Sequence, residues 1–269
     1  MSDYYRVFFG LKKEPFPADV DISDIYHTPD LSGLTERFNY AVRLGAMALV
    51  TGEIGSGKST ALRYAASQFH PSQYRILYLT ASSGSILEFY RLFSSELGLN
   101  ISSISKAVLI RAIKREILDL TMARKIKPIL IIDEASLMRL DVFSELHTLT
   151  QFEKDSKPYL PVILAGQNSL IDRLMYRASL PLASRIVARS HLEGVDRKEM
   201  ERYLSHHLAI AGIKHQCFDE AAVTAIHQGA GGLFRKANHL ARGAMVAAAA
   251  KKMNLVNADH VRLAASEIF

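Results

Sequence analysis

The sequence predicts an α/β fold, in which a five-stranded parallel sheet is covered by helices and followed by a small all-helical lid domain. Five short apolar runs are typical of buried strands, and helical patterns separate each run from the next. After Gly194 only helical patterns occur. Alternating strands and helices imply right-handed crossover connections, so we expect the strands to run parallel.

The strands are expected at residues 46–51, 75–80, 129–133, 162–166 and 186–192. Helices are expected among them at residues 35–44, 60–69, 85–97, 105–124 and 142–152, and beyond them at residues 197–211, 219–228, 234–252 and 257–269. We therefore divide the chain into an amino-terminal segment packed on the core (1–34), an α/β domain (35–194) and a helical lid domain (195–269). Aromatic residues and prolines in the first part predict an irregular segment.

Composition limits the function classes. The 269 residues include one cysteine, Cys217, which excludes an internal disulfide and a cysteine-based zinc site. The chain lacks a signal-peptide pattern, and no apolar run approaches the roughly 18 residues of a membrane span. We expect a cytoplasmic protein without a membrane partner. Its formal net charge of +6 favours polyanionic partners such as nucleic acid.

The sequence G-E-I-G-S-G-K-S-T fits the phosphate-loop pattern G-x-x-x-x-G-K-[ST], directly after a predicted strand and before a predicted helix. Glycines let successive backbone N–H groups point at a phosphate, and the helix adds its positive end. The pattern predicts an ATP site in which Lys58 bridges the β- and γ-phosphates and the Ser59 hydroxyl binds Mg²⁺. The residues of this loop are Gly52, Glu53, Ile54, Gly55, Ser56, Gly57, Lys58, Ser59 and Thr60.

Two carboxylates, Asp133 and Glu134, end the apolar run at residues 129–133. Desolvating paired acids is costly, so a buried strand has no structural use for them at its end. In a nucleotide site Asp133 holds Mg²⁺ through water, and Glu134 orients and deprotonates the attacking water. The alternative is that the pair only caps the next helix.

Three further polar residues are candidates for the site. Gln167 ends the strand at residues 162–166, which we expect between the phosphate-loop strand and the Asp133 strand, so it would point at the γ-phosphate or lytic water. Arg185 precedes the last strand and is the candidate for a catalytic arginine finger, in competition with Arg189. Arg235 opens a lid helix and would fold back over the phosphates. The alternatives are a loop-starting glutamine and solvated arginines.

These elements, in this order, resemble the AAA+ ATPases of the ExeA type (general secretion pathway protein A). They also resemble the related transposon ATPase subunits of the TniB, TnsC, IstB and phage Mu B group. Near the amino terminus the resemblance rests on F-G-L (9–11) and E-P-F (14–16). Near the carboxy terminus, G-L-F-R-K-A-N (232–238) is similar to the family's Gly-x-Pro-Arg-x-x-Asn motif. Two positions depart from the family pattern. Phe234 stands where proline is usual, and Gln167-Asn168 stands where Gln-Pro is frequent.

The resemblance implies an AAA+ P-loop core, with Gln167 as strand sensor, Arg185 as finger and Arg235 as lid sensor. In related proteins the finger acts on a neighbouring subunit, which implies a homo-oligomer, either a ring or a helical filament.

The favoured function is an ATP-dependent regulator of DNA transposition that assembles on duplex DNA with ATP, recruits and activates a transposase, and disassembles on hydrolysis. Its support includes a chain that ends with the ATPase module and a basic helix near residues 106–127. Candidate contacts to DNA are Lys106, Arg111, Lys114 and Arg115, although a solvated helix face explains each singly. Such binding would be independent of DNA sequence. The alternatives are a secretion or envelope-assembly ATPase that acts on proteins, and a replication-type loader.

Overall fold

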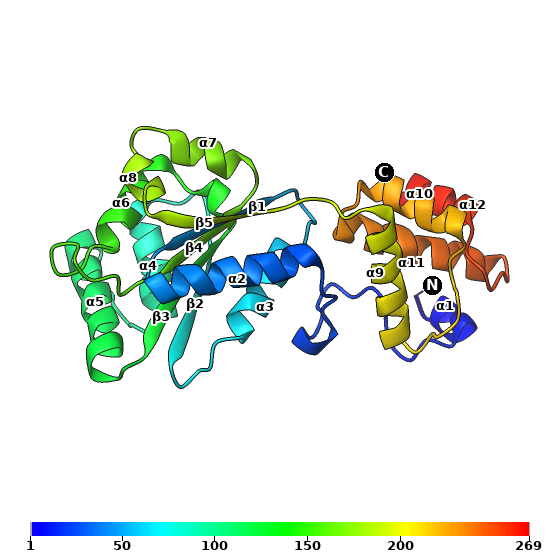
Figure 1. Ribbon diagram of the computed structural model, residues 1–269, viewed down its shortest axis with the longest axis horizontal. Helices are drawn as coiled ribbons and strands as arrows, with labels where there is room; N and C mark the ends of the chain where they lie inside the picture. Colours follow the sequence, from blue (N-terminus) through cyan, green and yellow to red (C-terminus); the bar gives the residue numbers. More distant parts are fainter. Residues whose placement is uncertain (1, 269) are drawn as a thin grey trace. The chain divides into compact units, whose positions relative to one another are not determined.

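A five-stranded parallel sheet forms the centre of the computed structural model, which describes residues 2–268. Its strands lie in the order β2-β3-β4-β1-β5 (Figure 1). Their bounds are β1 (Met47–Gly52), β2 (Tyr74–Thr80), β3 (Lys127–Asp133), β4 (Val162–Gly166) and β5 (Ile186–Leu192). All five predicted strands are present within three residues of the expected bounds, so the α/β fold is confirmed.

Side-chain alternation assigns the two faces of the sheet. Leu77, Leu79, Leu130 and Ile132 of neighbouring strands share one apolar cluster with helices. Every residue of the central strands β1 and β4 is buried, because helices cover both of their faces. β2 is an edge strand, and of its residues only Leu77 and Leu79 are buried.

The chain divides into two compact units, which we describe separately. The α/β unit comprises Pro29–Gly52 and Ala61–Leu192. The helical unit comprises Glu53–Thr60 together with the described residues of Met1–Thr28 and Glu193–Phe269. The phosphate loop thus clusters with the carboxy-terminal helices, although it follows β1 directly in the chain.

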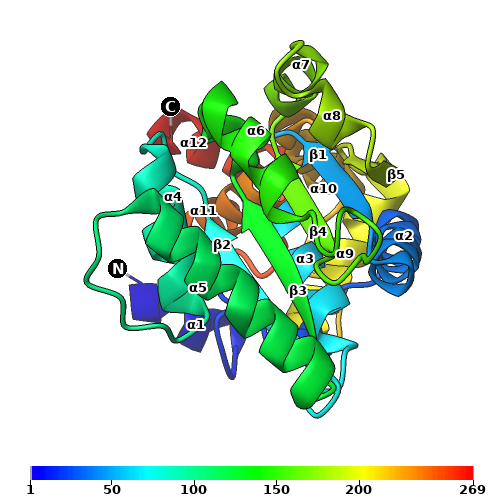
Figure 2. The same cartoon turned by 90° about the vertical axis from the view of Figure 1, so that its left-hand side faces the viewer.

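In the α/β unit, α4, α5 and α6 lie in front of the sheet in the view of Figure 2. The contacts of α2 are mainly with β1 and β5. The predicted helix at residues 105–124 ends as an α-helix at Leu118, and a turn of π-helix (Asp119–Ala123) follows. The helices of this unit are α2 (Pro29–Leu44), α3 (Lys58–Ser67, which belongs to this unit from Ala61 on), α4 (Ile86–Glu96), α5 (Lys106–Leu118), α6 (Leu140–Leu149), α7 (Ser169–Met175) and α8 (Leu180–Ala183).

The helical unit contains α1 (Ser2–Phe9), α9 (Arg197–Ile210), α10 (Glu220–Ala230), α11 (Phe234–Ala250) and α12 (Ala258–Ile268). Its core joins alanine-rich faces of α10–α12 to large side chains of the amino-terminal segment, including Tyr5, Phe9 and Phe16. None of the described helices is long and apolar enough to cross a membrane.

The structure corrects the expected irregular segment at residues 1–34. Residues 2–9 form α1, and α2 begins at Pro29 rather than near residue 35. Proline fits the first turn of a helix because its fixed φ is already helical and its missing N–H is not needed there. The apolar side chains Tyr5, Phe9, Leu11 and Phe16 pack into the core of the helical unit, since the neighbouring alanines leave space for large rings.

Candidate functional site

The phosphate loop, Glu53–Thr60, is folded as a nucleotide-binding loop requires. Gly55 and Gly57 have φ of +87° and +95°, a region that side chains rarely adopt. Lys58 is buried, and its Nζ donates to the Glu53 carbonyl oxygen at 2.9 Å. The Ser56 side chain is only 3% exposed, and its Oγ has no hydrogen-bond partner among the described residues. A buried hydroxyl without a partner fits a phosphate oxygen, because burial without a hydrogen bond is costly.

The amino terminus of α11 packs on this loop within the helical unit. The Arg235 backbone N–H donates to the Gly55 carbonyl oxygen at 3.2 Å. A Cβ at Gly55 would lie 2.8 Å from the Arg235 Cβ, so only glycine allows this approach. The Phe234 ring lies against Gly57 and against the ring of Tyr203, 4.5 Å away between centroids. Phe234 therefore fills the position at which the resemblance led us to expect proline and contacts the loop with its ring.

The two predicted carboxylates lie at the carboxyl end of β3 in the α/β unit. Asp133 is 5% exposed, and both of its oxygens accept hydrogen bonds. Oδ2 accepts from the Tyr78 hydroxyl at 2.7 Å and Oδ1 from the Glu134 backbone N–H at 2.9 Å. Glu134 has left-handed φ and ψ of 53° and 31°. Such backbone in a non-glycine residue is uncommon and often marks functional sites.

The carboxyl end of β4 adds Gln167 to this edge of the sheet. β4 lies between β1 and β3, as the sequence predicts, with Ile132 opposite Leu164. A Cβ on Gly166 would lie 2.9 Å from the Ser136 backbone nitrogen, so β4 closely approaches the turn after Glu134. The structure thus brings Asp133, Glu134 and Gln167 to one edge, because parallel strands end together.

Arg185 lies at the opposite, amino-terminal edge of the same sheet. Its carbonyl oxygen accepts from the Met47 N–H, at the start of β1. The guanidinium Nη2 donates to both Asp155 oxygens, at 2.6 and 2.5 Å, and Nε donates to His147 Nδ1 at 3.2 Å. The hydrogen bond from Arg185 lowers the pKa of Asp155, while burial and the Arg185 charge lower the pKa of His147. The competing Arg189 is exposed on β5.

The four basic candidates for DNA contact lie on α5 and divide into two pairs. Lys106 is paired with Glu145 at 2.5 Å. Lys114 donates to the carbonyl oxygens of Thr148 and Gln151 at the end of α6, and burial lowers its pKa. Arg111 and Arg115 are exposed. The exposed pair is therefore the better candidate for phosphate contact.

Sequence reasoning missed three residues beside these candidates. The Tyr78 hydroxyl contacts Asp133, and the Ser136 hydroxyl contacts the Gln167 backbone. Asp155 contacts Arg185. Only Tyr78 left a signal, since its hydroxyl interrupts an apolar strand and needs a partner. Ser136 lies in a short 3-10 helix (Ala135–Leu137) and Asp155 in a turn, and polar residues are ordinary in both.

Comparisons with known proteins agree with this architecture. The family described as AAA domain matches residues 42–174. General secretion pathway protein A of Aeromonas hydrophila is 28% identical over 265 residues, which cover 98% of this chain and 48% of the relative. The chain thus spans about half the length of that curated relative.

Solved structures share the fold. Cdc6p of Pyrobaculum aerophilum has a TM-score of 0.72 and 16% identity, over 98% of this chain and 71% of that one. The Aeropyrum pernix ORC1 protein in complex with DNA has a TM-score of 0.70 and 16% identity, over 96% and 70% of the two chains. The described phosphate loop, the strand-end carboxylates and the AAA domain match agree on an AAA+ P-loop ATPase fold, and the chain is similar to general secretion pathway protein A along 98% of its length.

Proposed function

We propose that the protein is an ATP-dependent regulator of DNA transposition. It would assemble on duplex DNA in the ATP state, recruit and activate a transposase, and disassemble on hydrolysis. The cytoplasm, where ATP is available, is the compartment in which this cycle would run. The observation that carries the assembly step is the place of Arg185, at the edge of the sheet opposite Asp133 and Glu134.

The proposed division of labour follows from the donors and acceptors present. Lys58 and the loop N–H groups would hold the phosphates, and Ser59 and Asp133 would hold Mg²⁺. Mg²⁺ would supply neutralisation of phosphate charge. Glu134 accepts a proton from the attacking water, and Gln167 orients that water. These assignments, and Arg235 as a lid sensor, are the roles that their positions support.

Strand geometry argues that Arg185 serves a second copy of the chain. Arg185 precedes β5, whose first residue, Ile186, pairs with Met47 at the start of β1. Asp133 lies at the other end of β3, which is three positions from β5 in the sheet. The two side chains are on the order of 20 Å apart, given about 3.3 Å per strand residue and 4.8 Å per strand. One arginine side chain cannot cover this distance. A finger role for Arg185 therefore requires an oligomer, either a ring or a filament.

DNA as the assembly surface has separate support. Arg111 and Arg115 present two exposed charges one helical turn apart on α5, and the whole chain carries a net charge of +6. Contacts of this kind would go to phosphates, so affinity should fall steeply with salt and depend little on base sequence.

The decisive experiment measures assembly and ATPase rate together. The protein is mixed with ATP, with ADP or with a non-hydrolysable ATP analogue, with and without duplex DNA, at about 50 and 200 mM salt. Sedimentation and electron microscopy report the assemblies. We expect long or ring-shaped particles only with the ATP analogue, increased by DNA at low salt. Absence of any DNA effect on both assembly and hydrolysis would remove the transposition function.

A matched pair of variants isolates the phosphate loop. Lys58→Ala should abolish binding of a fluorescent ATP analogue, since the buried ammonium is the charge that bridges the phosphates. Lys125→Ala, on an exposed turn of the α/β unit, should leave binding unchanged. Equal binding by both variants would show that Glu53–Thr60 is not the nucleotide site. Co-purification with a candidate transposase, with and without ATP, then tests the recruitment step.

A secretion or envelope-assembly ATPase is the second candidate. The relative named general secretion pathway protein A favours it, because its likeness extends along 98% of this chain. This function predicts ATP-dependent assembly that is indifferent to DNA, in the same experiment. The likeness to Cdc6p and ORC1, at 16% identity, concerns the fold and gives no separate weight to a replication-type loader.

A further inference from the structure

The Asp133 carboxylate has a side-chain partner on the neighbouring strand. The Tyr78 hydroxyl donates to Asp133 Oδ2 at 2.7 Å, the ordinary length of a strong bond from a hydroxyl to a carboxylate. The other oxygen accepts from the Glu134 N–H. An ionised carboxylate offers about four acceptor positions, and these two bonds use one on each oxygen. The carboxylate is thus held on both sides.

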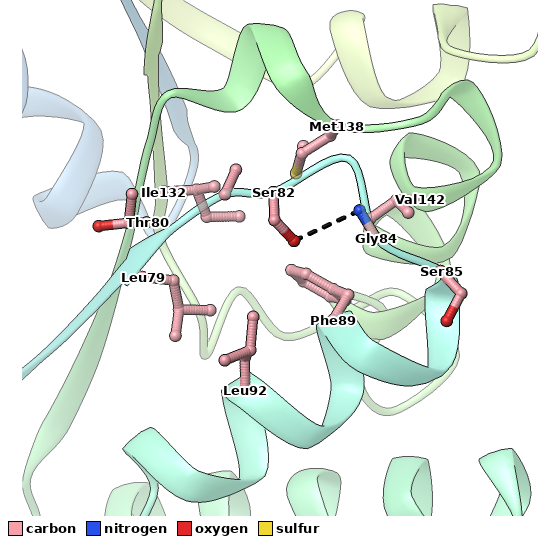
Figure 3. Close-up of a pocket in the computed structure, with 11 residues that line it drawn as sticks. Leu79, Thr80, Ser82, Gly84, Ser85, Phe89, Leu92, Ile132, Met138 and Val142 are labelled. Atoms are coloured by element: carbon pink, nitrogen blue, oxygen red, sulfur yellow. Dashed lines mark hydrogen bonds between the residues drawn. The ribbon is translucent and has the colours of Figure 1, made fainter.

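The register of the sheet explains why Tyr78 reaches this carboxylate. In the β2–β3 pair Tyr78 lies opposite Ile131 and Thr80 opposite Asp133. Tyr78 and Asp133 are therefore diagonal neighbours on one face, a separation that a long aromatic side chain spans. Leu77 and Leu79 face the other way into the apolar core, and Figure 3 shows Leu79 turned toward α4 and Leu92.

The backbone of Tyr78 is itself anchored. β2 is an edge strand, so its outward N–H groups have no neighbouring strand to bond. The Tyr78 N–H donates instead to the Glu96 carboxylate at 3.2 Å, and Arg75 donates to the Glu96 carbonyl oxygen. α4 thereby fixes β2 at the residue whose hydroxyl holds Asp133. A donor on a fixed backbone positions its acceptor at little entropic cost.

We propose that Tyr78 is a positioning residue for metal binding, acting through Asp133. This inference rests on the proposed role of Asp133 toward Mg²⁺. The Tyr78 hydroxyl restricts the carboxylate to the orientation in which its oxygens meet the water shell of the ion. Partners that orient metal ligands in this way contribute strongly to metal affinity. Nucleotide binding in the absence of the ion does not depend on Tyr78.

The test compares Tyr78→Phe with Tyr74→Phe. Both variants lose only a hydroxyl from β2, and Tyr74 makes no described hydrogen bond to Asp133. Mn²⁺ serves as the probe, titrated by electron paramagnetic resonance in the presence of a non-hydrolysable ATP analogue. Tyr78→Phe should weaken Mn²⁺ binding roughly tenfold. In the ATPase assay it should raise the half-saturating Mg²⁺ concentration by a similar factor, with little change in kcat at saturation.

Two further measurements complete the test. Affinity for the ATP analogue in excess EDTA should be equal in the unmodified protein and both tyrosine variants, which separates a metal-specific role from general damage. Mn²⁺ binding by Tyr78→Phe within twofold of Tyr74→Phe would overturn the inference. Asp133→Asn distinguishes the proposed metal role of Asp133 from the positioning role of Tyr78. If Asp133→Asn weakens Mn²⁺ binding and Tyr78→Phe does not, only the role of Tyr78 fails. If Asp133→Asn also binds Mn²⁺ normally, the proposed metal role of Asp133 fails with it.

Discussion

The α/β unit and the helical unit build their cores from different side chains. The α/β core is made mainly of leucine, isoleucine, valine and phenylalanine from a sheet and its covering helices. In the helical unit alanines dominate α10–α12, and the helices approach closely: a Cβ on Gly243 would lie 2.7 Å from the Ala264 Cβ. Its largest fully buried rings, Tyr5 and Phe16, come from the amino-terminal segment.

The two units also hold their candidate site residues in different ways. The sheet orders Asp133, Glu134 and Gln167 through main-chain register, which is rigid because every central strand is bonded on both sides. The helical unit binds the phosphate loop through the end of one helix, at Phe234 and Arg235. We therefore expect chemistry to depend on the first unit, and the stability of the loop's surroundings to depend on segments far apart in sequence.

The largest expected effect tests where the chemistry lies. Glu134→Gln should lower the ATPase rate by about 10²–10⁴ and retain ATP binding, because it removes the proton acceptor and preserves shape. The assembled ATP state should persist. Glu153→Gln is the matched control, since Glu153 also has a left-handed backbone, with φ of 46°. Normal turnover by Glu134→Gln would assign the proton transfer to another residue.

Next in size is the loss of a ring that joins distant segments of the helical unit. Phe16 is 1% exposed, so Phe16→Ala should destabilise this unit by about 3–5 kcal/mol. Hydrogen exchange should speed up in α9 and remain slow in β3. The exposed Tyr4→Ala should change neither. Equal loss of protection in both units would contradict the distinction between their cores.

Lowering the pH should reduce the folding stability by a smaller amount. Burial, followed by repulsion from His206, lowers the pKa of His207 from 6.5 to about 4. The unfolded chain then takes up a proton at higher pH than the folded one. The folded state is most stable above about pH 6.5, and its stability falls by about 3 kcal/mol as the pH falls toward 4, at 1.36 kcal/mol per pKa unit. Denaturant titrations of His207→Phe should lack this slope; an unchanged slope would assign it elsewhere.

The smallest effect concerns the amino-terminal edge of the sheet. Asp155 holds Arg185 by two hydrogen bonds, which would have to break for Arg185 to act on another copy as proposed. Asp155→Asn should raise the ATPase rate about two- to fivefold at protein concentrations that limit assembly, the range that one exposed ion pair allows. Asp141→Asn, which loses a pair with Arg139, is the control. A lower rate in Asp155→Asn would instead make this contact supportive of the finger.

Local signals made the sheet and the nucleotide motifs predictable. The strand runs, the glycine-rich loop and the Asp133–Glu134 pair each lie within a few consecutive residues. The spacing of apolar residues and short sequence motifs therefore indicate them directly. The irregular reading of residues 1–34 was wrong for α1, because Pro15 and Pro17 outweighed the preceding helical aromatic spacing.

By itself the sequence determined five parallel strands, a phosphate loop between β1 and α3, and carboxylates at the end of β3. Only the tertiary structure decided that Tyr78 holds Asp133, that Asp155 holds Arg185, and that Phe16 packs among carboxy-terminal helices. The reason is physical: backbone pattern is encoded by neighbours in the chain. A side-chain partner depends on strand register and on helix packing, which bring together residues as far apart as Tyr78 and Asp133.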